Sequence, residues 1–566
     1  MILRSEAVIA DYTARGWWGH ETLNDMLARH VRETPGQDAL VDPSNRAEIT
    51  DGAPKRYTYA ELDRAVNRLA ARLLEQGATK DTIMAVQLPN IAELVLVYLA
   101  AAKIGAIVSP FPVQYREFEL EQLGNFVEAE LFITAGRIGK HLHAEMVATL
   151  QPKMPKLKKI LALGQNLPDG VIALDPLLET EPDFTLLEKH VSQHLVNAND
   201  IVTICWTSGT EGRPKGVPRS HNDWIVPAYG TVDAGEIEAG WHLLNPFPLV
   251  NMAGIGGMLV PWLLTGGKLV MHHPLSLPVF LQQIAQEKIH YTVAPPALLN
   301  MLLQNEALLA SANIRSIKTI GSGSAPLSPW MVKSWQDRFG IKVINYFGSN
   351  EGTTIVSGPR EIADPEHRAQ FFPRFGVAGF DWTARVAQRM STKLVDLSTN
   401  QEITEPAQPG ELLIKGAAVF LGYYKSPDLT ARVMDADGFF HTGDMFEIAG
   451  DMGQFYRYVG RSKDLVIRGG MNISPEEIET LLQGHPKVAE VAVIGVPDPV
   501  MGERVYACVT PRPNQEITLE ELVEFLKEKK IAVFKLPEKL VIMPALPRNP
   551  VGKLLKGDLR RNLQEV

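Results

Sequence analysis

Apolar residues return at helical spacing over much of the chain, and short continuous apolar runs separate these stretches. In YTYAELDRAVNRLAARLLEQG, residues 57–77, the residues Leu62, Val66, Leu69 and Leu73 recur every three or four positions, which predicts an amphipathic helix. The run IMAVQLP that follows has the composition of a buried strand, and IAELVLVYLAAAKIGA predicts the next helix. Repeated strand–helix–strand units imply parallel sheets covered by helices. The pattern therefore predicts an α/β fold.

A different pattern begins near Ala384. Up to about Asp444 the chain consists of short β-like runs punctuated by Gly and Pro, among them GELLIKG, which predicts a smaller β subdomain. We place a domain boundary near Gly460 to Asp464, ahead of the last hundred residues.

The last hundred residues predict an independent α+β module. Ser474, Pro475 and Glu477 have the spacing of an N-cap, a first-turn proline and a capping-box glutamate at the start of a helix. EVAVIGV and VYACVT follow as predicted strands, and Thr518 with Glu521 predicts the cap of a second helix.

Length and charge limit the classes of protein that fit. The 566 residues are too many for one core, because domains usually hold roughly 100–200 residues. With 45% hydrophobic and 21% charged residues, the composition is that of a globular protein. The formal charge of -9 argues against a nucleic-acid partner, since such proteins concentrate basic residues that displace counterions from phosphates.

The two cysteines, Cys205 and Cys508, form no CxxC pair, which argues against a disulfide framework and a cysteine zinc site. A reducing cytoplasm is the simplest compartment for such a chain. The start, MILRSEAVIADYTARG, lacks the apolar core of a signal peptide. The longest apolar stretch, residues 252–267, is too short to span a bilayer. We expect a cytoplasmic protein without an integral membrane segment.

The loop TSGTEGRPKG, residues 207–216, has the composition of a phosphate-binding loop. It follows the apolar run IVTICW, so a predicted strand would present its glycines, its hydroxyls and Lys215 to an anion. The spacing of a Walker P-loop fails, because Pro214 and Val217 stand five residues after Gly209 and Gly212. A hydrophilic surface turn is the alternative interpretation of this loop taken alone.

Further segments carry side chains suited to a nucleotide. NYFGSNEG places Phe347, which can stack on a purine, four residues before Glu351, whose carboxylate can bind Mg²⁺. FFHTGD delivers Asp444 from a turn, where a carboxylate can accept hydrogen bonds from a ribose diol. Arg461 lies in GRSKDLVIRGG, and Lys553 follows a glycine in PRNPVGK. Each segment taken singly could equally be a surface turn.

The order of the motifs is more specific than any one of them. Along the chain stand TSGTEGRPKG, NYFGSNE, GYYKSPDLT, GFFHTGD, GRSKDLVIRGGMNISPEEIE and PRNPVGK. This series resembles the adenylate-forming superfamily of acyl- and aryl-CoA synthetases, luciferases and peptide-synthetase adenylation domains, over nearly the whole chain. The resemblance implies a large N-terminal domain, residues 1–460, of two helix-covered, mainly parallel sheets with the β subdomain at about 384–460. It also implies a mobile α+β C-terminal domain, residues 461–566.

The resemblance also implies roles for individual residues. In the family the phosphate loop cradles the β- and γ-phosphates of ATP, and it carries over onto Thr207, Ser208, Gly209, Thr210, Gly212 and Lys215. The rest of the nucleotide site carries over onto Ser324, Ala325, Pro326, Asn345, Tyr346, Phe347, Gly348 and Asn350. Phe347 stands where relatives usually have tyrosine, so stacking is kept and a hydroxyl is lost. Asn350 replaces the usual threonine, and its amide still offers an oxygen.

Charged residues complete the implied adenylation site. Glu351 matches the glutamate linked to Mg²⁺, Asp444 and Arg461 match the ribose-binding pair, and Lys553 matches the lysine that contacts the carboxylate and the α-phosphate. In-line attack of a carboxylate on the α-phosphorus needs positioning and charge neutralisation more than acid–base help. Lys215, Glu351 and Lys553 are therefore the expected catalytic residues.

The implied second half-reaction transfers the acyl group from the adenylate to the thiol of CoA. In the family the C-terminal domain rotates about a hinge residue, which is Lys463 here. Rotation withdraws Lys553 and brings in Gly469 and Gly470, which line the pantetheine tunnel in relatives. The expected cofactors are ATP, Mg²⁺ and CoA, and the expected substrate is a small carboxylic acid.

The acid pocket is expected to involve NPFPLVNMAGIGG and GSGSAPLS, with Asn251, Met252, Gly256, Gly321 and Gly323 as its residues. Met252 stands where amino-acid-activating relatives place aspartate, so no partner for an α-ammonium is offered. Asn251 stands where many relatives carry histidine. The residues around them suggest an apolar pocket, with an ordinary core helix as the alternative.

Local signals point to different acids and acceptors. VPRSHNDW and the early YTARGWW resemble aryl-acid adenylating enzymes that load siderophore carrier proteins, whereas VQYREFEL resembles alicyclic and short- or medium-chain acyl-CoA ligases. We predict a CoA ligase for an apolar monocarboxylic acid, as a homodimer or monomer, ahead of an aryl-acid adenylase with an acyl or aryl carrier protein as partner. A catalytically idle scaffold ranks third, because Lys553, Glu351 and Asp444 are all present.

Overall fold

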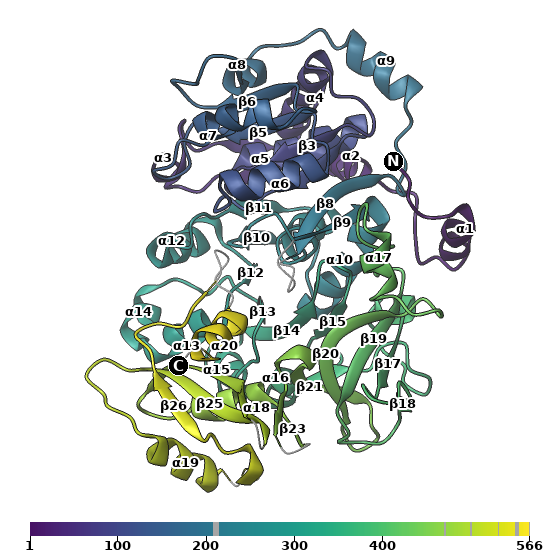
Figure 1. The fold of residues 1–566 in the computed structure, drawn as a ribbon. Helices are drawn as coiled ribbons and strands as arrows, with labels where there is room; N and C mark the ends of the chain where they lie inside the picture. The colour runs from purple at the N-terminus through teal and green to yellow at the C-terminus, as the bar shows by residue number, and fades with distance from the viewer. Residues whose placement is uncertain are drawn as a thin grey trace. The chain divides into compact units, whose positions relative to one another are not determined.

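The computed structural model describes residues 1–207, 214–468, 471–498, 501–529, 531, 533–548 and 554–564 (Figure 1). The chain divides into two compact units, one of residues 1–391 and 414–440 and a second of residues 392–413 and 441–566. Among the described helices, none has both the length and the apolar character that a bilayer crossing requires.

The first sheet of the first unit has seven strands in the order β7-β6-β5-β3-β4-β8-β9 (Figure 1). Neighbouring strands run parallel except β8 and β9, which form an antiparallel hairpin. Its strands are β3 Ile83–Val86, β4 Ile107–Pro110, β5 Leu131–Ala135, β6 Lys159–Leu163, β7 Val171–Ala173, β8 Ile201–Thr207 and β9 Lys215–Ser220.

The second sheet of this unit has eight strands in the order β15-β14-β13-β12-β10-β11-β1-β2. Its pairs are parallel except at the two edges, where β14 with β15 and β1 with β2 are antiparallel. Its strands are β1 Asp38–Val41, β2 Arg56–Thr58, β10 His242–Asn245, β11 Lys268–Met271, β12 Tyr291–Val293, β13 Thr319–Gly323, β14 Lys342–Gly348 and β15 Thr354–Ser357.

Helices cover both faces of both sheets. The helices around the seven-stranded sheet are α2 Leu23–Glu33, α3 Arg46–Ile49, α4 Tyr59–Glu75, α5 Ala92–Ile104, α6 Glu117–Phe126, α7 His143–Leu150, α8 Leu174–Glu179 and α9 Thr185–Gln193. Those around the eight-stranded sheet are α10 His221–Gly235, α11 Val260–Thr265, α12 Leu277–Glu287, α13 Pro296–Gln304, α14 Glu306–Ser311, α15 Pro329–Phe339 and α16 Pro365–Gln370. The unit also contains α1 Glu6–Ala14, η1 Gln151–Lys153, the π-helical turn η2 Ile255–Leu259, β16 Phe371–Pro373, η3 Ala387–Arg389 and α17 Pro427–Ala431.

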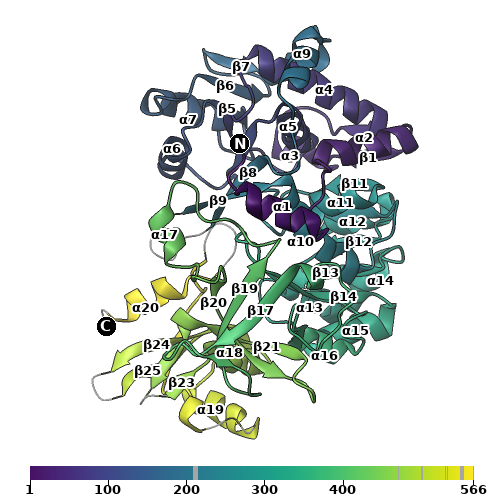
Figure 2. The ribbon, with the colours of Figure 1, turned by 90° about the vertical axis from the view of Figure 1, so that its right-hand side faces the viewer.

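The period of two along each strand explains this layering. Met84 and Val86 of β3 belong to the same apolar cluster as α2, α4, α5, α10 and α11, whereas Ile83 and Ala85 pack with α6 and α7. The cluster of Met84 also includes residues of β1, β10 and β11, so one layer of helices is shared by the two sheets. The opposite face of the eight-stranded sheet packs against α12 to α15 (Figure 2). The predicted pair of helix-covered, mainly parallel sheets is therefore confirmed.

The residues predicted as a β subdomain form strands in the order β21-β20-β19-β17-β18, of which β20 with β21 and β17 with β18 pair antiparallel. They are β17 Met390–Val395, β18 Glu402–Ile403, β19 Gly410–Gly416, β20 Phe440–Ala449 and β21 Phe455–Arg461. The boundary between the two units passes through β17, β19 and β20.

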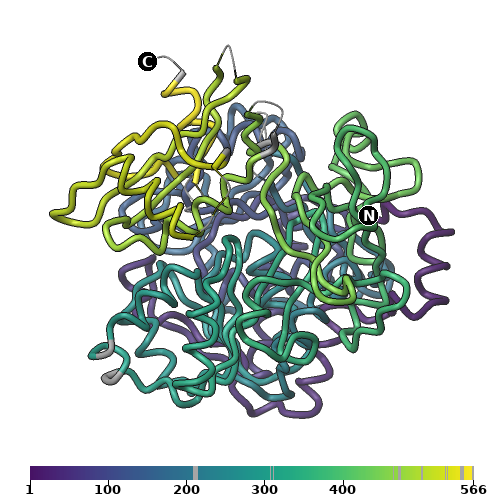
Figure 3. Tube along the Cα trace, turned by 90° about the horizontal axis from the view of Figure 1, so that it is seen from below, coloured from purple at the N-terminus to yellow at the C-terminus, as the bar shows by residue number. Residues whose placement is uncertain are grey.

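The C-terminal module, the yellow end of the tube in Figure 3, has a sheet in the order β23-β22-β25-β24, with β26 parallel to β25. Its elements are η4 Ser462–Asp464, β22 Val466–Arg468, β23 Met471–Ile473, α18 Pro475–Leu482, β24 Val488–Asp498, β25 Gly502–Pro511, α19 Leu519–Glu528, η5 Val533–Lys535, β26 Lys539–Ile542 and α20 Lys556–Gln564. Val491 and Val493 pack with α18 and α19 on one face, and Ala492 and Ile494 pack with α20 on the other. The predicted α+β character is confirmed.

The two predicted helix caps of this module differ in outcome. Thr518 and Glu521 form a complete capping box at the start of α19. At α18 the Ser474 hydroxyl accepts from the Glu477 backbone N–H at 3.3 Å, as predicted. The Glu477 carboxylate, however, accepts two hydrogen bonds from Lys535, at 2.7 and 2.9 Å. The prediction of a full box is wrong there, because the charged ammonium takes the carboxylate.

Candidate active site

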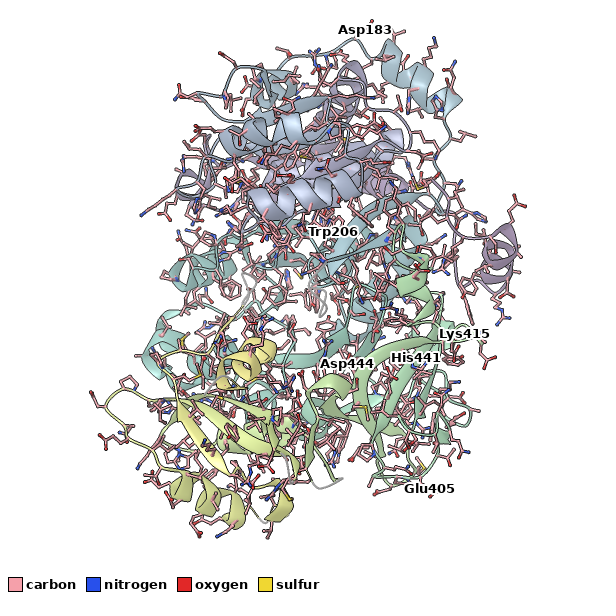
Figure 4. All side chains as sticks on the ribbon, in the orientation of Figure 1. Asp183, Trp206, Glu405, Lys415, His441 and Asp444 are labelled. Atoms are coloured by element: carbon pink, nitrogen blue, oxygen red, sulfur yellow. The ribbon has the colours of Figure 1, made fainter. Side chains whose placement is uncertain are left out.

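The predicted phosphate loop connects two paired strands. Thr207 ends β8, Lys215 begins β9, and the two residues are partners in the antiparallel register. Figure 4 marks Trp206, the residue before Thr207. The predicted loop residues Ser208, Gly209, Thr210 and Gly212 lie outside the described residues. The structure thus fixes both ends of the loop on a rigid hairpin of the sheet.

Asn350 joins three parts of the predicted site. Its Oδ1 accepts from the Met252 backbone N–H at 2.7 Å, and its Nδ2 donates to the Trp206 carbonyl at 3.0 Å. The strand that leads into the phosphate loop, the acid segment and the turn that holds Glu351 are therefore held by one amide. The oxygen that the sequence analysis offered to a phosphate or metal already accepts a backbone hydrogen bond.

Glu351 lies in a nearly closed environment, with 9% of its surface exposed. The Tyr423 hydroxyl donates to its Oε1 at 3.0 Å, and the Lys215 Nζ lies 4.9 Å from the centroid of the Tyr423 ring. Burial, helped by the charge of Glu351, raises the pKa of Tyr423, so its hydroxyl stays a neutral donor. Sequence reasoning used GYYKSPDLT to recognise the family but missed Tyr423, the tyrosine directly after its glycine, because the motif does not show that this hydroxyl reaches Glu351, 72 residues earlier.

The acid segment begins with a capped turn. Asn251 Oδ1 accepts from the backbone N–H groups of Ala253 and Gly254, at 3.1 and 3.2 Å. The chain continues as the π-helical turn η2, a geometry that is frequent at functional sites, and then as α11. Met252 packs closely on this turn, because a Cβ at Gly256 would lie 2.6 Å from its sulfur. Ile255, Met258 and Leu259 of this turn also belong to the apolar core, so the segment combines the burial of a core helix with π-helical geometry.

Tyr346 brings together residues predicted for the nucleotide and for the acid. Its hydroxyl is hydrogen-bonded to the Tyr291 hydroxyl at 2.7 Å. A Cβ at Gly321 would lie 2.4 Å from the Tyr346 ring, and one at Gly323 would lie 2.5 Å from the Tyr346 carbonyl. The two predicted pocket glycines on β13 are therefore needed to admit this side chain and its strand.

The other predicted nucleotide residues have varied environments. Phe347 is half-buried and packs edge-to-face on Phe372, with ring centroids 6.0 Å apart. Asn345 is buried and donates from Nδ2 to the Ala369 carbonyl at 2.9 Å, so its amide serves the fold. Ser324, with a left-handed φ of 68°, is exposed. Exposed too are Ala325, Pro326 and Gly348.

The predicted ribose pair belongs to the second unit. Asp444 and Arg461 are register partners on β20 and β21, and Arg461 Nε donates to Asp444 Oδ1 at 2.9 Å. Burial lowers the pKa of Arg461, but the charge and hydrogen bond of Asp444, together with Tyr458 and Asp464, outweigh it, so the net shift of the pKa is upward. His441, on the same strand as Asp444 (Figure 4), is hydrogen-bonded through Nδ1 to Glu411 at 2.9 Å. The pair is preformed.

Lys553, Gly469 and Gly470 lie outside the described residues, and their roles remain predictions. The predicted hinge residue, Lys463, is part of the 3₁₀ turn η4, whose Asp464 accepts from Arg560 Nη1 at 3.1 Å.

VPRSHNDW, one of the two motifs that resembled aryl-acid enzymes, contacts residues on either side of the other motif, YTARGWW. Asn222 of VPRSHNDW accepts from the Gly19 N–H and donates to the Gly19 carbonyl, both at 3.1 Å. His221 Nδ1 accepts from the Leu23 N–H at 3.2 Å, and Asp223 forms an ion pair with Arg4 at 3.2 Å. These side chains hold the N-terminal segment against α10, so their presence is explained without reference to the acid.

Comparisons with known proteins place the chain in a family. The model for the AMP-binding enzyme matches residues 27–424, and the model for the AMP-binding enzyme C-terminal domain matches residues 477–553. The chain therefore belongs to the AMP-binding enzyme family, which confirms the predicted membership and the prediction that it is an enzyme.

Similar proteins match over almost their full lengths. A medium-chain fatty-acid–CoA ligase of Escherichia coli (strain K12) is 29% identical and covers 98% of this chain and 92% of the relative. An indoleacetate–CoA ligase of Aromatoleum aromaticum (strain DSM 19018 / LMG 30748 / EbN1) is 29% identical and covers 95% of this chain and 98% of the relative. A crystal structure of the ATP-bound RpMatB-BxBclM chimera B1, 25% identical, has a TM-score of 0.78 and covers 96% of this chain and 100% of that one.

Glu351 fits a metal that arrives with a nucleotide. Among the described residues, no group of three or more His, Cys, Asp or Glu side chains could hold a metal ion alone. Mg²⁺ is typically held by one or two carboxylates together with substrate phosphates. Glu351 is a single carboxylate that the Tyr423 hydroxyl orients, and the Tyr423 ring also contacts Lys215, at the end of the phosphate loop. This arrangement suits that mode of Mg²⁺ binding.

Proposed function

We propose that this enzyme activates an apolar monocarboxylic acid with ATP, releases pyrophosphate and transfers the acyl group to CoA, leaving AMP. The observation that carries the proposal is the arrangement of Lys215, Tyr423 and Glu351, tied through Asn350 to an acid segment that contains no acidic side chain. An ammonium and a carboxylate at the two sides of one tyrosine supply the charges that a polyphosphate and its metal require.

In the first half-reaction, an oxygen of the substrate carboxylate attacks the α-phosphorus, and the bond from the α-phosphorus to the bridging oxygen breaks. The pyrophosphate that leaves carries the negative charge that Lys215 neutralises. Mg²⁺ bound with Glu351 would offset further phosphate charge. Lys553 is our proposed contact to the carboxylate and the α-phosphate, while Asp444 with Arg461 would hold the ribose. The products are an acyl-adenylate and pyrophosphate.

The side chains in and around the acid segment favour an apolar substrate. Met252, Gly256, Gly321 and the paired Tyr346 and Tyr291 offer thioether, methylene and aromatic surface. An α-ammonium group would find no carboxylate here, which disfavours amino acids. The names of the medium-chain fatty-acid and indoleacetate ligases concern monocarboxylic acids with apolar bodies, in agreement with this proposal.

For the second half-reaction we propose rotation of the C-terminal residues about Lys463, with Gly469 and Gly470 lining the path of the pantetheine arm. The acceptor is CoA rather than a carrier protein, because the His221–Asp223 motif that favoured aryl-acid carrier loading serves to fix the N-terminal segment. Two buried free thiols, Cys205 and Cys508, are consistent with our placement of the enzyme in the reducing cytoplasm.

ATP–pyrophosphate exchange over a panel of linear, alicyclic and aryl acids tests the first step. We expect exchange with one or more apolar acids and none with amino acids. AMP production should then depend on free CoA. Exchange without CoA-dependent AMP production would favour the carrier-loading alternative, and no exchange with any acid would favour an idle relative.

A separate experiment tests whether Lys553 acts only in adenylate formation. Lys553→Ala should abolish exchange while the variant still forms the thioester from a supplied acyl-adenylate and CoA. Equal loss of both half-reactions would refute the assignment of Lys553 to adenylation alone.

A further inference from the structure

We propose that Tyr423 keeps Lys215 and Glu351 apart, so that one remains free for the phosphates of ATP and the other for Mg²⁺. The Tyr423 hydroxyl donates a hydrogen bond to the Glu351 carboxylate, and the Tyr423 ring contacts the Lys215 ammonium. Tyr423 is then a positioning residue that acts through two charged neighbours. This inference rests on the proposed function and assigns a role to a residue outside the predicted site.

The side chain of Tyr423 lies between the two charges. The hydroxyl donates to Glu351 Oε1 at 3.0 Å, and Lys215 Nζ lies 4.9 Å from the ring centroid, within the range of a cation–π contact. Within the described part of the chain, neither Lys215 nor Glu351 forms an ion pair, and each has Tyr423 as a neutral partner instead.

The backbone around Tyr423 fixes this position from both sides. The Phe420 N–H donates to the Glu351 carbonyl at 2.8 Å, and the Tyr424 N–H donates to the Gly216 carbonyl at 2.8 Å. The Tyr423 N–H donates to the Thr430 hydroxyl at 2.9 Å. The segment is therefore bonded both to the turn of Glu351 and to the strand of Lys215, and its ring cannot drift away from either.

Electrostatics explain why a separator is useful here. Opposite unit charges attract strongly where water is scarce, and Glu351 has only 9% of its surface exposed. A direct Lys215–Glu351 ion pair would cancel the two charges that the polyphosphate and its metal need. A phenol satisfies one carboxylate oxygen without adding charge, and its π face holds the ammonium more weakly than a phosphate would.

Separate substitutions test the two contacts. Tyr423→Phe removes the hydroxyl and keeps the ring, so the Mg²⁺ concentration for half-maximal pyrophosphate exchange should rise about tenfold, or about 1.4 kcal/mol, with a smaller change in the KM for ATP. Tyr423→Leu also removes the ring, so both quantities should rise. Tyr424→Phe is the matched control: the Tyr424 ring lies edge-to-face on Phe126 and belongs to the apolar cluster of Trp206, and the Mg²⁺ dependence of this variant should equal that of the wild type.

A binding measurement separates this inference from the proposed function. Calorimetric titration with a non-hydrolysable ATP analogue, with and without Mg²⁺, should show that Tyr423→Phe loses most of the affinity gained from the metal. In the Glu351→Gln background the Tyr423→Phe change should have no further effect on that gain.

An unchanged metal dependence in Tyr423→Phe, an equal shift in Tyr424→Phe, or an undiminished effect in the Glu351→Gln background would each overturn the inference. Failure of wild-type exchange with every acid would instead strike the proposed function, since the titration does not depend on turnover.

Discussion

The Asn350 side chain holds the backbone of Met252: its Oδ1 accepts the Met252 N–H at 2.7 Å, while Nδ2 donates to the Trp206 carbonyl at 3.0 Å. Only an amide of this length can accept at one end and donate at the other. Asn350→Asp replaces the donor with a second acceptor that faces the Trp206 carbonyl, and so leaves buried groups unpaired at a cost of about 1–3 kcal/mol. We expect a lower melting temperature and a KM for the acid at least tenfold higher.

Thermal unfolding and steady-state kinetics check this prediction. Asn125→Asp is a suitable control, because its exposed amide makes a comparable bond to the Lys153 carbonyl. An Asn350→Asp variant with a wild-type KM for the acid would show that the amide does not position Met252 for catalysis.

Arg46 joins helix α5 to the end of strand β1 in the first unit. It donates to both oxygens of Glu93 on α5 at 2.8 Å and also bonds Asp42, which follows β1. All three side chains are buried. Removal of one partner leaves uncompensated charge in the interior, so Arg46→Ala should destabilise the unit by about 3–5 kcal/mol. Denaturant unfolding measures the change.

Arg29→Ala is the control, because it removes an exposed pair with Glu21 and should lower the free energy of unfolding by less than about 1 kcal/mol. Equal losses of unfolding free energy in the two variants would show that burial is not the cause.

Acid should destabilise the fold through buried histidines. Burial lowers the pKa of His143 and of His221 to about 4, whereas an unfolded histidine titrates near about 6.5. Between these values the unfolded chain binds more protons than the folded one, so stability is complete above about pH 6.5 and falls as the pH drops toward 4.

His143→Gln tests the pH dependence. It keeps a polar contact for Gln87, whose Oε1 lies 2.9 Å from His143 Nδ1, and it removes the titration. The loss of stability between pH 6.5 and 4 should shrink by up to about 3 kcal/mol in this variant, at about 1.4 kcal/mol per pKa unit. His20→Gln, at an exposed position, should leave the slope unchanged. Parallel stability curves for His143→Gln and the wild type would contradict the prediction.

Periodicity and capping predicted elements well where a single segment determines them. Tyr59–Glu75, Ala92–Ile104 and Ile201–Thr207 form as expected, because each carries its own apolar pattern. Contacts between residues far apart along the chain could not be predicted from the sequence. Nothing near Tyr423 indicates that it bonds a carboxylate 72 residues away. Nothing in VPRSHNDW shows that Asn222 serves Gly19, 203 residues before it. At Ser474 the local pattern was right for the hydroxyl and wrong for Glu477, because the competing Lys535 comes from another element.

The Asp444–Arg461 pair should govern affinity for ATP. A carboxylate accepts two hydrogen bonds from a ribose diol more strongly than an amide does, and the hydrogen bond from Arg461 holds the Asp444 carboxylate in place. We expect Asp444→Asn to raise the KM for ATP about tenfold or more, with a smaller effect on the KM for the acid. Asp451→Asn, at an exposed turn after β20, is the control. Equal changes in both KM values would indicate general disruption instead of a ribose contact.

Tyr346 should limit the length of the acid that the enzyme accepts. Its ring occupies the space beside Gly321, and its hydroxyl is tied to Tyr291 at 2.7 Å, so the side chain cannot swing aside without breaking a buried hydrogen bond. Tyr346→Ala removes the ring and should shift the optimum of kcat/KM toward longer acids, by about 0.8 kcal/mol for each additional buried methylene that the space admits.

Tyr346→Phe keeps the ring and should leave the chain-length profile in place at some cost in stability, because the Tyr291 hydroxyl loses its partner. Gly321→Ala should act in the opposite sense to Tyr346→Ala: its Cβ would lie 2.4 Å from the Tyr346 ring and push it out of place, which lowers activity with every acid. An acid panel run on all three variants decides the matter, since a chain-length optimum that stays unchanged in Tyr346→Ala would place the end of the pocket elsewhere.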